Sequence, residues 1–231
     1  MNTLGIIGGI GPGSTVDYYQ TIIELYRARK ADGSYPAILI NSIDVHRVLA
    51  TVSAGELKAL IDWLLIELQK LERAGADFAI MASNTPHIVF DDLERQSPLP
   101  LISIVAETAT VAKGRGLKRL GLFGTRFTMQ GPVYREVFGR QEIAVVVPEP
   151  ADVEYIHEKY MSELVDGVFL PETRARLLGI VDRMAKQSGI DGMILGGTEL
   201  PLILREPAYD GIPLLNTTRI HCEAAVERMF S

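Results

Sequence analysis

The length and charge of the chain set the first limits on its function. The sequence has 231 residues, of which 47% are hydrophobic and 23% are charged, and its formal net charge is −6. Lys and Arg are spread singly along the chain, which disfavours a nucleic-acid partner. The longest apolar runs are far shorter than the roughly 20 residues of a membrane span, and the N-terminus has no basic leader. We therefore expect a cytoplasmic globular protein without membrane contact.

The cysteine and histidine content indicates neither a disulfide nor a structural metal. Cys222 is the single cysteine, so it has no internal disulfide partner, and the four histidines are scattered along the chain. None of these residues has the spacing of a zinc site. We expect no metal, and we expect Cys222 to be a buried, unreactive thiol in a C-terminal helix.

Short apolar runs alternate with segments of helical periodicity along the whole chain. This alternation is typical of βα units and predicts an α/β fold with parallel sheets. The expected strands are 3–8, 36–43, 77–82, 100–104, 118–123, 143–147, 191–195 and 213–215. The expected helices are 15–30, 56–74, 86–96, 105–115, 129–139, 151–166, 172–188 and 218–230.

Three blocks of sequence recur at matched distances in the two halves of the chain. GIIGGIG resembles GLFGTRF, RAGADFAIMASNTP resembles QSGIDGMILGGTELP, and SPLPLISI resembles DGIPLLNT. We therefore expect two similar lobes with central parallel sheets, related by a pseudo-twofold, with a ligand cleft between them. The predicted N-terminal lobe comprises residues 1–104 plus 216–231, and the C-terminal lobe comprises residues 105–215.

The glycine-rich segment GIIGGIGPGST predicts a strand-to-helix turn without a nucleotide site. Ser14 stands where a dinucleotide fingerprint needs glycine and where a phosphate-binding loop needs lysine. The backbone N–H groups of Gly9, Ile10 and Gly11 could instead hold a carboxylate. Ser14 or Thr15 is expected to cap the following helix.

Arg47 follows the predicted strand 36–43 and is a candidate partner for a substrate carboxylate. A guanidinium group can hold a carboxylate through two parallel hydrogen bonds. A solvated surface position is the alternative explanation for this residue.

The predicted strand 77–82 runs into three polar residues, Ser83, Asn84 and Thr85, which we call the first tip. Ligands bind beyond the carboxyl ends of the strands in an open parallel sheet. We expect Thr85 to cap a helix with Pro86 in its first turn, and the end of that helix to favour an anion. A purely structural capping role for the three polar residues is the alternative.

The second tip, GGTE at 196–199, occupies the equivalent place in the other half of the chain. Thr198 could cap a helix, while Glu199 would act either as a capping carboxylate or in catalysis. Thr125 and Thr128 correspond to the first glycine-rich turn, and they are candidates for ligand contact or for simple capping.

At these residues the chain resembles the aspartate/glutamate racemase family, from GIIGGIGPGST through SNTPH and FGTRFTM to LGGTELPL. The resemblance implies two α/β lobes, no cofactor, and a small-molecule amino-acid substrate that carries carboxylate groups. It also implies a homodimer. In the family, two cysteines act on opposite faces of the substrate Cα: one thiolate removes the proton and the other thiol returns one. The family pattern is Cys-Asn-Thr at the first tip and Gly-Cys-Thr-Glu at the second, and here Ser83 and Gly197 stand at the cysteine positions.

The replacement of both cysteines changes the chemistry that the tips can perform. A serine hydroxyl is a weaker acid than a thiol by several pKa units and needs a neighbouring base, whereas glycine offers no group. Ser83 could relay a proton or donate to an enolate oxygen, with His87 or Glu199 as the titrating partner. These residues and position 197 are the catalytic candidates.

Three functions stay open at this stage. The first is a racemase or epimerase for a small acidic amino acid, with an altered acid/base pair. The second keeps the cleft but performs a one-sided proton transfer, as in decarboxylation or a lyase step. The third is a binding or regulatory protein without turnover. We favour the first because the resemblance covers nearly the whole chain.

Overall fold

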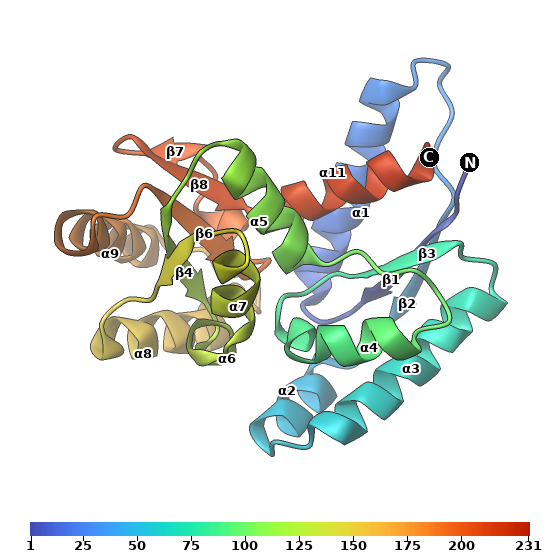
Figure 1. Cartoon of the computed structure of the whole chain (residues 1–231), viewed down its shortest axis with the longest axis horizontal. Helices are drawn as coiled ribbons and strands as arrows, with labels where there is room; N and C mark the ends of the chain where they lie inside the picture. Colours follow the sequence, from blue (N-terminus) through green and yellow to red (C-terminus); the bar gives the residue numbers. More distant parts are fainter. The chain divides into compact units, whose positions relative to one another are not determined.

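The computed structural model describes all 231 residues and divides into two compact α/β units (Figure 1). Unit 1 comprises Met1–Ile104 and His221–Ser231, and unit 2 comprises Val105–Ile220. The chain returns to unit 1 at His221, inside the last helix, whereas the sequence placed this boundary at residue 216. Both units contain parallel strands connected by helices, which confirms the predicted α/β class.

Unit 1 contains a parallel sheet of three strands in the order β2-β1-β3. Beyond β3, a single parallel bridge joins Ala79 to Leu101. The strand expected at 100–104 is therefore wrong: only this bridge forms, and a helix already begins at Ile104. The elements are β1 (Leu4–Gly8), α1 (Pro12–Arg29), β2 (Ile38–Ser42), α2 (Val45–Ser53), α3 (Leu57–Arg73), β3 (Phe78–Met81), the 3-10 helix η1 (Thr85–Val89), α4 (Phe90–Gln96) and most of α11 (Thr217–Met229).

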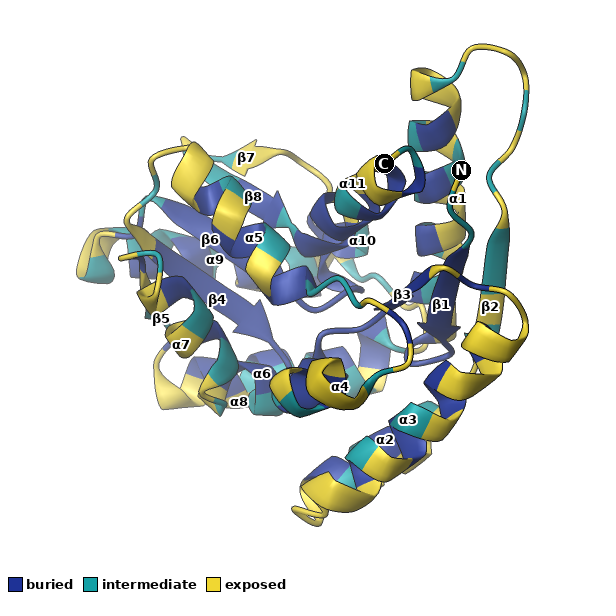
Figure 2. Ribbon diagram, turned by 45° about the vertical axis from the view of Figure 1, so that its right-hand side comes forward, coloured by how far each residue is buried: buried dark blue, intermediate teal, exposed yellow.

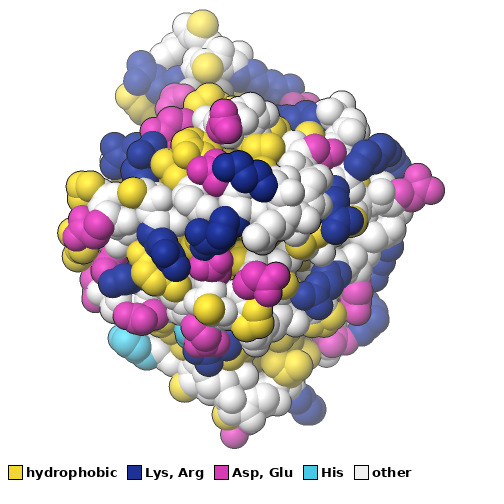
Figure 3. Space-filling model, turned by 90° about the vertical axis from the view of Figure 1, so that its left-hand side faces the viewer, with side chains coloured by type: hydrophobic (Ala, Val, Ile, Leu, Met, Phe, Trp, Pro, Cys, Tyr) yellow, Lys and Arg dark blue, Asp and Glu magenta, His cyan; other side chains and the backbone are white.

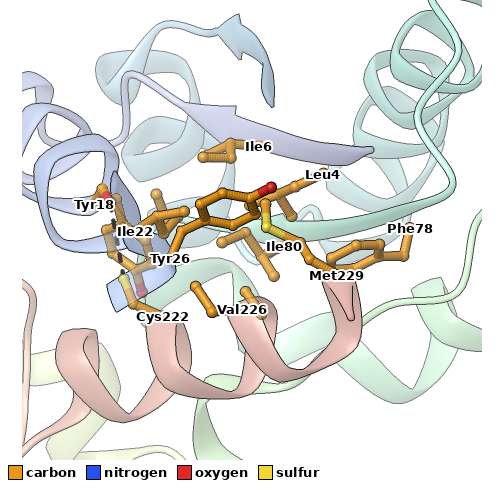
Figure 4. Close-up of a cluster of buried hydrophobic side chains, with 12 residues drawn as sticks. Leu4, Ile6, Tyr18, Ile22, Tyr26, Phe78, Ile80, Cys222, Val226 and Met229 are labelled. Atoms are coloured by element: carbon orange, nitrogen blue, oxygen red, sulfur yellow. Dashed lines mark hydrogen bonds between the residues drawn. The ribbon is translucent and has the colours of Figure 1, made fainter. Parts of the chain in front are cut away.

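Helices cover both faces of the unit 1 sheet because successive side chains of a strand point to opposite sides. Leu4 and Ile6 of β1 point into a cluster formed with α1 and α11 (Figure 4). Gly5 faces the other side, where an added Cβ would lie 3.1 Å from Leu71 of α3. Each fully buried aliphatic or aromatic side chain in such a cluster contributes about 1.5 to 3 kcal/mol. The cluster also holds Tyr18, Ile22, Tyr26, Phe78, Ile80, Ala82, Cys222, Ala225, Val226 and Met229.

Cys222 belongs to this core, as predicted. Its side chain has 0% exposure, and its Sγ lies 4.0 Å from the carbonyl oxygen of Tyr18, the contact drawn as a dashed line in Figure 4. The thiol is therefore packed between α11 and α1 within unit 1. In the sequence, Cys222 lies far from the residues of both tips.

Unit 2 repeats the strand order of unit 1 with its fourth strand fully formed. Its sheet has the order β5-β4-β6-β8-β7, in which only β7 is antiparallel to its neighbour. Since β4, β5 and β6 correspond to β1, β2 and β3, strand β8 takes the place of the single bridge at Leu101. The elements are α5 (Ile104–Gly114), β4 (Arg119–Gly124), α6 (Arg126–Gln130), α7 (Val133–Gly139), β5 (Ala144–Val146), α8 (Pro150–Lys159), the π-helix η2 (Tyr160–Leu164), α9 (Pro171–Ser188), β6 (Gly192–Gly196), α10 (Leu200–Ile203), β7 (Ala208–Tyr209) and β8 (Ile212–Asn216).

Several helix boundaries differ from the predictions. Helix α1 begins at Pro12 with Gly11 at the N-cap position, so neither Ser14 nor Thr15 caps it. The helix expected at 86–96 is divided into η1 and α4, the one at 129–139 into α6 and α7, and the one at 151–166 changes to a π-helix after Lys159. Helix α2, whose first turn is capped by the Asp44 carboxylate, was not predicted.

Burial follows the central strands of each unit. Strands β1, β3 and β6 are buried along their whole length and β4 along nearly all of it (Figure 2). On the face shown in Figure 3, basic and acidic side chains are intermixed. No helix combines the length and the apolarity that a membrane crossing requires.

Candidate functional site

The first tip lies directly after β3 in unit 1. Ser83, Asn84 and Thr85 are all buried. The prediction that Thr85 caps a helix is wrong: Asn84 occupies the N-cap position of η1, Thr85 is its first residue, and no side chain forms the cap. Pro86 lies in the first turn, as expected. The chain turns here into a five-residue 3-10 helix that begins at Thr85.

His87 is held by two backbone groups beside the first tip. Its Nε2 accepts a hydrogen bond from the Ile104 N–H at 3.2 Å, so its Nδ1 carries the proton and donates to the Ser83 carbonyl at 2.9 Å. Burial, followed by the nearby His221, lowers the pKa of His87 to about 3. The ring therefore stays neutral and anchors the Ser83 backbone. In this arrangement neither ring nitrogen is open to accept a proton from the Ser83 hydroxyl.

His221 supports the same region from α11. Its Nδ1 lies 2.9 Å from the Tyr18 hydroxyl and its Nε2 lies 3.0 Å from the Ile102 carbonyl. Burial lowers its pKa to about 4. The two imidazole rings contact each other edge to face, with centroids 6.1 Å apart. Unit 1 thus places a pair of neutral, fully buried histidines behind the first tip.

The turn between β1 and α1 folds back on itself through Thr15. The Gly9 N–H donates to the Thr15 hydroxyl oxygen at 2.8 Å, and that hydroxyl donates to the Gly11 carbonyl at 3.3 Å. Gly9 has a φ of 81°, and an added Cβ would lie 2.2 Å from the Ile43 carbonyl oxygen, so glycine is required there. One of the three N–H groups expected to hold a carboxylate is therefore already bonded, and those of Ile10 and Gly11 are the remaining candidates.

Arg47 lies on the exposed surface of α2. Its guanidinium carbon is 4.1 Å from the centroid of the Trp63 ring on α3, a cation–π contact that typically contributes about 0.5 to 1 kcal/mol at an exposed site. This contact fits the surface alternative better than a role in binding a carboxylate.

The second tip, after β6, is filled by a side chain that the sequence repeat does not predict. An added Cβ at Gly197 would lie 2.5 Å from Cε2 and 2.7 Å from Oη of Tyr160. Tyr160 is the first residue of η2 and is 5% exposed. Its ring therefore occupies the space that any side chain at position 197 would need.

Two hydroxyl groups converge on the Glu199 carboxylate. The Tyr160 hydroxyl donates to Oε2 of Glu199 in a very short contact, and the Thr198 hydroxyl lies 3.1 Å from the same oxygen. Glu199 is 4% exposed and occupies the N-cap position of α10, but its side chain makes no capping bond. Burial, followed by the Glu199 charge, raises the pKa of the Tyr160 phenol, so the phenol keeps its proton. The geometry places a buried carboxylate behind a phenol at this tip.

Thr125 and Thr128 lie at the end of β4 in unit 2. Thr125 caps α6, because its hydroxyl oxygen accepts from the Thr128 N–H at 3.3 Å, and the two hydroxyl oxygens are 3.2 Å apart. This arrangement bears out the capping explanation for Thr125. Between them, Arg126 forms an ion pair with Glu154 at 2.6 Å. No three His, Cys, Asp or Glu side chains come together in a way that would hold a metal ion.

Comparisons with known proteins point to one family. The sequence model described as Asp/Glu/hydantoin racemase matches residues 7–225. The broad specificity amino-acid racemase RacX of Bacillus subtilis is 30% identical over 140 residues, which are 58% of this chain and 59% of that protein. The chain thus matches less than two thirds of this relative's length.

Two solved structures resemble this one along the whole chain. A candidate Asp/Glu racemase from Yersinia pestis superposes with a TM-score of 0.88 at 29% identity, and each chain is fully covered. An aspartate racemase homologue from Pyrococcus horikoshii superposes with a TM-score of 0.82 at 31% identity, again with full coverage of both chains.

Proposed function

Because the chain belongs to the Asp/Glu/hydantoin racemase family, we propose that it moves the α-proton of an amino acid without a cofactor. In this proposal it is a racemase or epimerase with an altered acid/base pair, and its candidate groups are those of the two tips. The observation that supports the proposal most strongly is the buried Glu199 carboxylate, which receives hydrogen bonds from two hydroxyl groups at the second tip.

The proposed substrate is a small acidic amino acid. The candidate carboxylate-binding groups are Asn84, Thr85 and the N–H groups of Ile10 and Gly11 in unit 1, and Thr198 in unit 2. Backbone N–H groups and hydroxyls that converge on an anion act as charge-assisted donors and hold it in a fixed orientation. Fixing the carboxylates would align the Cα–H bond with the group that removes the proton.

The two tips would perform different parts of the proton transfer. Glu199 is the proposed base, since a carboxylate accepts a proton far more readily than a serine hydroxyl. On the other face, Ser83 would relay a proton from solvent water: its hydroxyl proton would pass to Cα while a water proton replaces it, and the proton held by Glu199 would neutralise the hydroxide that remains. His87 would position Ser83 through its backbone contact and stay neutral, because its ring nitrogens are already bonded.

The chemical difference between the two tips favours a second candidate function. A carboxylate on one side and a weakly acidic hydroxyl on the other would suit a one-sided proton transfer, as in a decarboxylase or a lyase. The same enolate would form in these reactions, but a single proton would be delivered on one face.

Proton exchange in D2O tests these proposals directly. Each enantiomer of aspartate, glutamate and a panel of other amino acids is incubated with the protein, and the α-proton is followed by NMR with chiral chromatography of the product. We expect loss of the α-proton signal together with formation of the opposite enantiomer. Release of CO2 or ammonia with one configuration of product would identify the second candidate. A rise in melting temperature with a ligand, without α-proton exchange and without release of CO2 or ammonia from any amino acid, would contradict both and identify a binding protein.

A further inference from the structure

The phenol end of Tyr160 lies where the family's second thiol would stand. Oη is 2.7 Å from the position of a Cβ at residue 197, and the sulfur of a cysteine there would lie only one bond beyond that Cβ. A proton-carrying oxygen therefore occupies the volume that a cysteine side chain would fill. The group comes from η2, which is separated from the second tip in the sequence.

We propose that the Tyr160 hydroxyl replaces this thiol as the group that exchanges a proton with the substrate Cα, an inference that rests on the proposed function. The Glu199 carboxylate is the terminal acceptor behind it. When the Cα–H bond breaks, its proton goes to Oη and its electron pair stays on the substrate as an enolate. In the same step, the proton that Oη carried passes to Oε2 of Glu199. Return of a proton reverses both transfers.

This coupled transfer avoids a phenolate. Burial and the adjacent carboxylate hold the pKa of Tyr160 well above its ordinary value, so a free phenolate beside Glu199 would be strongly disfavoured. In the coupled step the hydroxyl gains one proton as it loses another, and Glu199 alone changes its charge. The Thr198 hydroxyl, 3.1 Å from Oε2, keeps that oxygen in place during the transfer.

The local backbone supports a dedicated position for Tyr160. The Val165 N–H bonds to the Tyr160 carbonyl at 3.0 Å, the i to i+5 spacing of a π-helix, and single π-turns occur frequently at functional sites. The turn is held by the buried Glu163 carboxylate, which accepts from Lys159 at 2.7 Å and from Thr173 at 2.6 Å. An irregular turn that is fixed in this way presents its first side chain to the second tip.

The test compares Tyr160→Phe, which keeps the ring and removes the hydroxyl, with Tyr155→Phe on the adjacent helix α8 as a matched control. Exchange of the α-proton in D2O is measured separately from each enantiomer. We expect Tyr160→Phe to slow exchange from one enantiomer by at least about 100-fold, the usual range for a lost acid/base group. Exchange from the other enantiomer, which begins on the face served by Ser83, should fall much less. Tyr155→Phe should leave both rates unchanged.

Three outcomes would overturn the inference. Wild-type exchange rates in Tyr160→Phe would show that the hydroxyl carries no proton. Equal losses from both enantiomers, with a lower melting temperature, would assign Tyr160 a structural role. If the wild-type protein exchanges no α-proton from any amino acid, the proposed function fails and this inference fails with it, whereas the first two outcomes leave the proposed function standing.

Discussion

The two tips hold their polar groups by different means. At the first tip, Ser83 provides a side chain of its own, and the neutral ring of His87 fixes the backbone around it. At the second tip, Gly197 provides none, and the space is filled by Tyr160, whose hydroxyl binds Glu199. The strands that carry the tips, β3 and β6, occupy equivalent places in their sheets.

This difference shows that equivalent positions in a repeat need not supply equivalent groups. In the proposed mechanism, the group missing at position 197 is replaced by Tyr160 from η2, for which the small glycine makes room. The comparison also separates the tips electrostatically. Two neutral, buried histidines lie behind the first tip, whereas a buried carboxylate and a buried phenol meet at the second.

The largest expected effect is a loss of the stability of unit 1 at acidic pH. The pKa values of His87 and His221 are lowered to about 3 and about 4, below the ordinary value of about 6.5. Between these limits the unfolded chain binds protons that the folded unit does not, so the free energy of unfolding falls as the pH drops. We expect a loss on the order of 3 kcal/mol between pH 7 and pH 5.

Urea unfolding followed by the fluorescence of Trp63, the single tryptophan, reports on unit 1 and measures this loss. The pH range lies above the titration of ordinary carboxylates, so these contribute little. An unchanged unfolding midpoint from pH 7 to pH 5 would contradict the assignment of neutral, buried histidines.

Introducing a cysteine should destabilise the two tips to different extents. Gly197→Cys forces a side chain into the buried Tyr160 ring, and such overpacking should cost about 2 kcal/mol of stability. Ser83→Cys exchanges groups of similar shape and should cost less than about 1 kcal/mol. Chemical denaturation of both variants measures the difference.

The Tyr160→Ala background provides the control. Removing the ring opens the space beside position 197, so Gly197→Cys should cost less there than in the wild-type chain. Equal costs in both backgrounds would show that Tyr160 does not compete with a side chain at position 197.

The smallest expected difference concerns the two threonines that follow β1 and β4. Thr15→Val removes a bond from the Gly9 N–H and a bond to the Gly11 carbonyl, whereas Thr125→Val removes its cap to the Thr128 N–H. Each should cost about 1 kcal/mol, with the larger loss at Thr15, because the bond from the Gly9 N–H, at 2.8 Å, is shorter than the bond from the Thr128 N–H, at 3.3 Å. Thr→Ser at either position keeps the hydroxyl and should recover most of the stability. A larger loss at Thr125 would reverse this ranking.

Much of the fold could be predicted from the sequence because buried parallel strands are continuous apolar runs. The matched blocks predicted two similar lobes, and the strand orders β2-β1-β3 and β5-β4-β6 agree with this prediction. The run at 100–104 was misleading, since its apolar residues pair at Leu101 only and then enter α5. Helix α2 had a usable signal in Asp44, whose side chain accepts from the His46 N–H at 2.9 Å.

Only part of the candidate site could be predicted from the sequence. The tip residues follow strands and could be located from the pattern, and the cap formed by Thr125 was among the alternatives. Tyr160 could not be found in this way, because it meets Gly197 through tertiary packing and belongs to a π-turn that has no sequence signature. The role of His87 also depends on the distant Ile104 N–H, which no local pattern places beside its ring.

The burial of Cys222 has a consequence for how the protein tolerates its chemical surroundings. The single sulfhydryl is buried in the core of unit 1, so thiol-alkylating reagents and peroxide should leave Cys222 unmodified in the native protein. Proton transfer through oxygen groups would then need no reducing conditions, in contrast to a mechanism based on two thiolates. The rate at which a thiol reagent labels Cys222 would in turn measure how often the core of unit 1 opens.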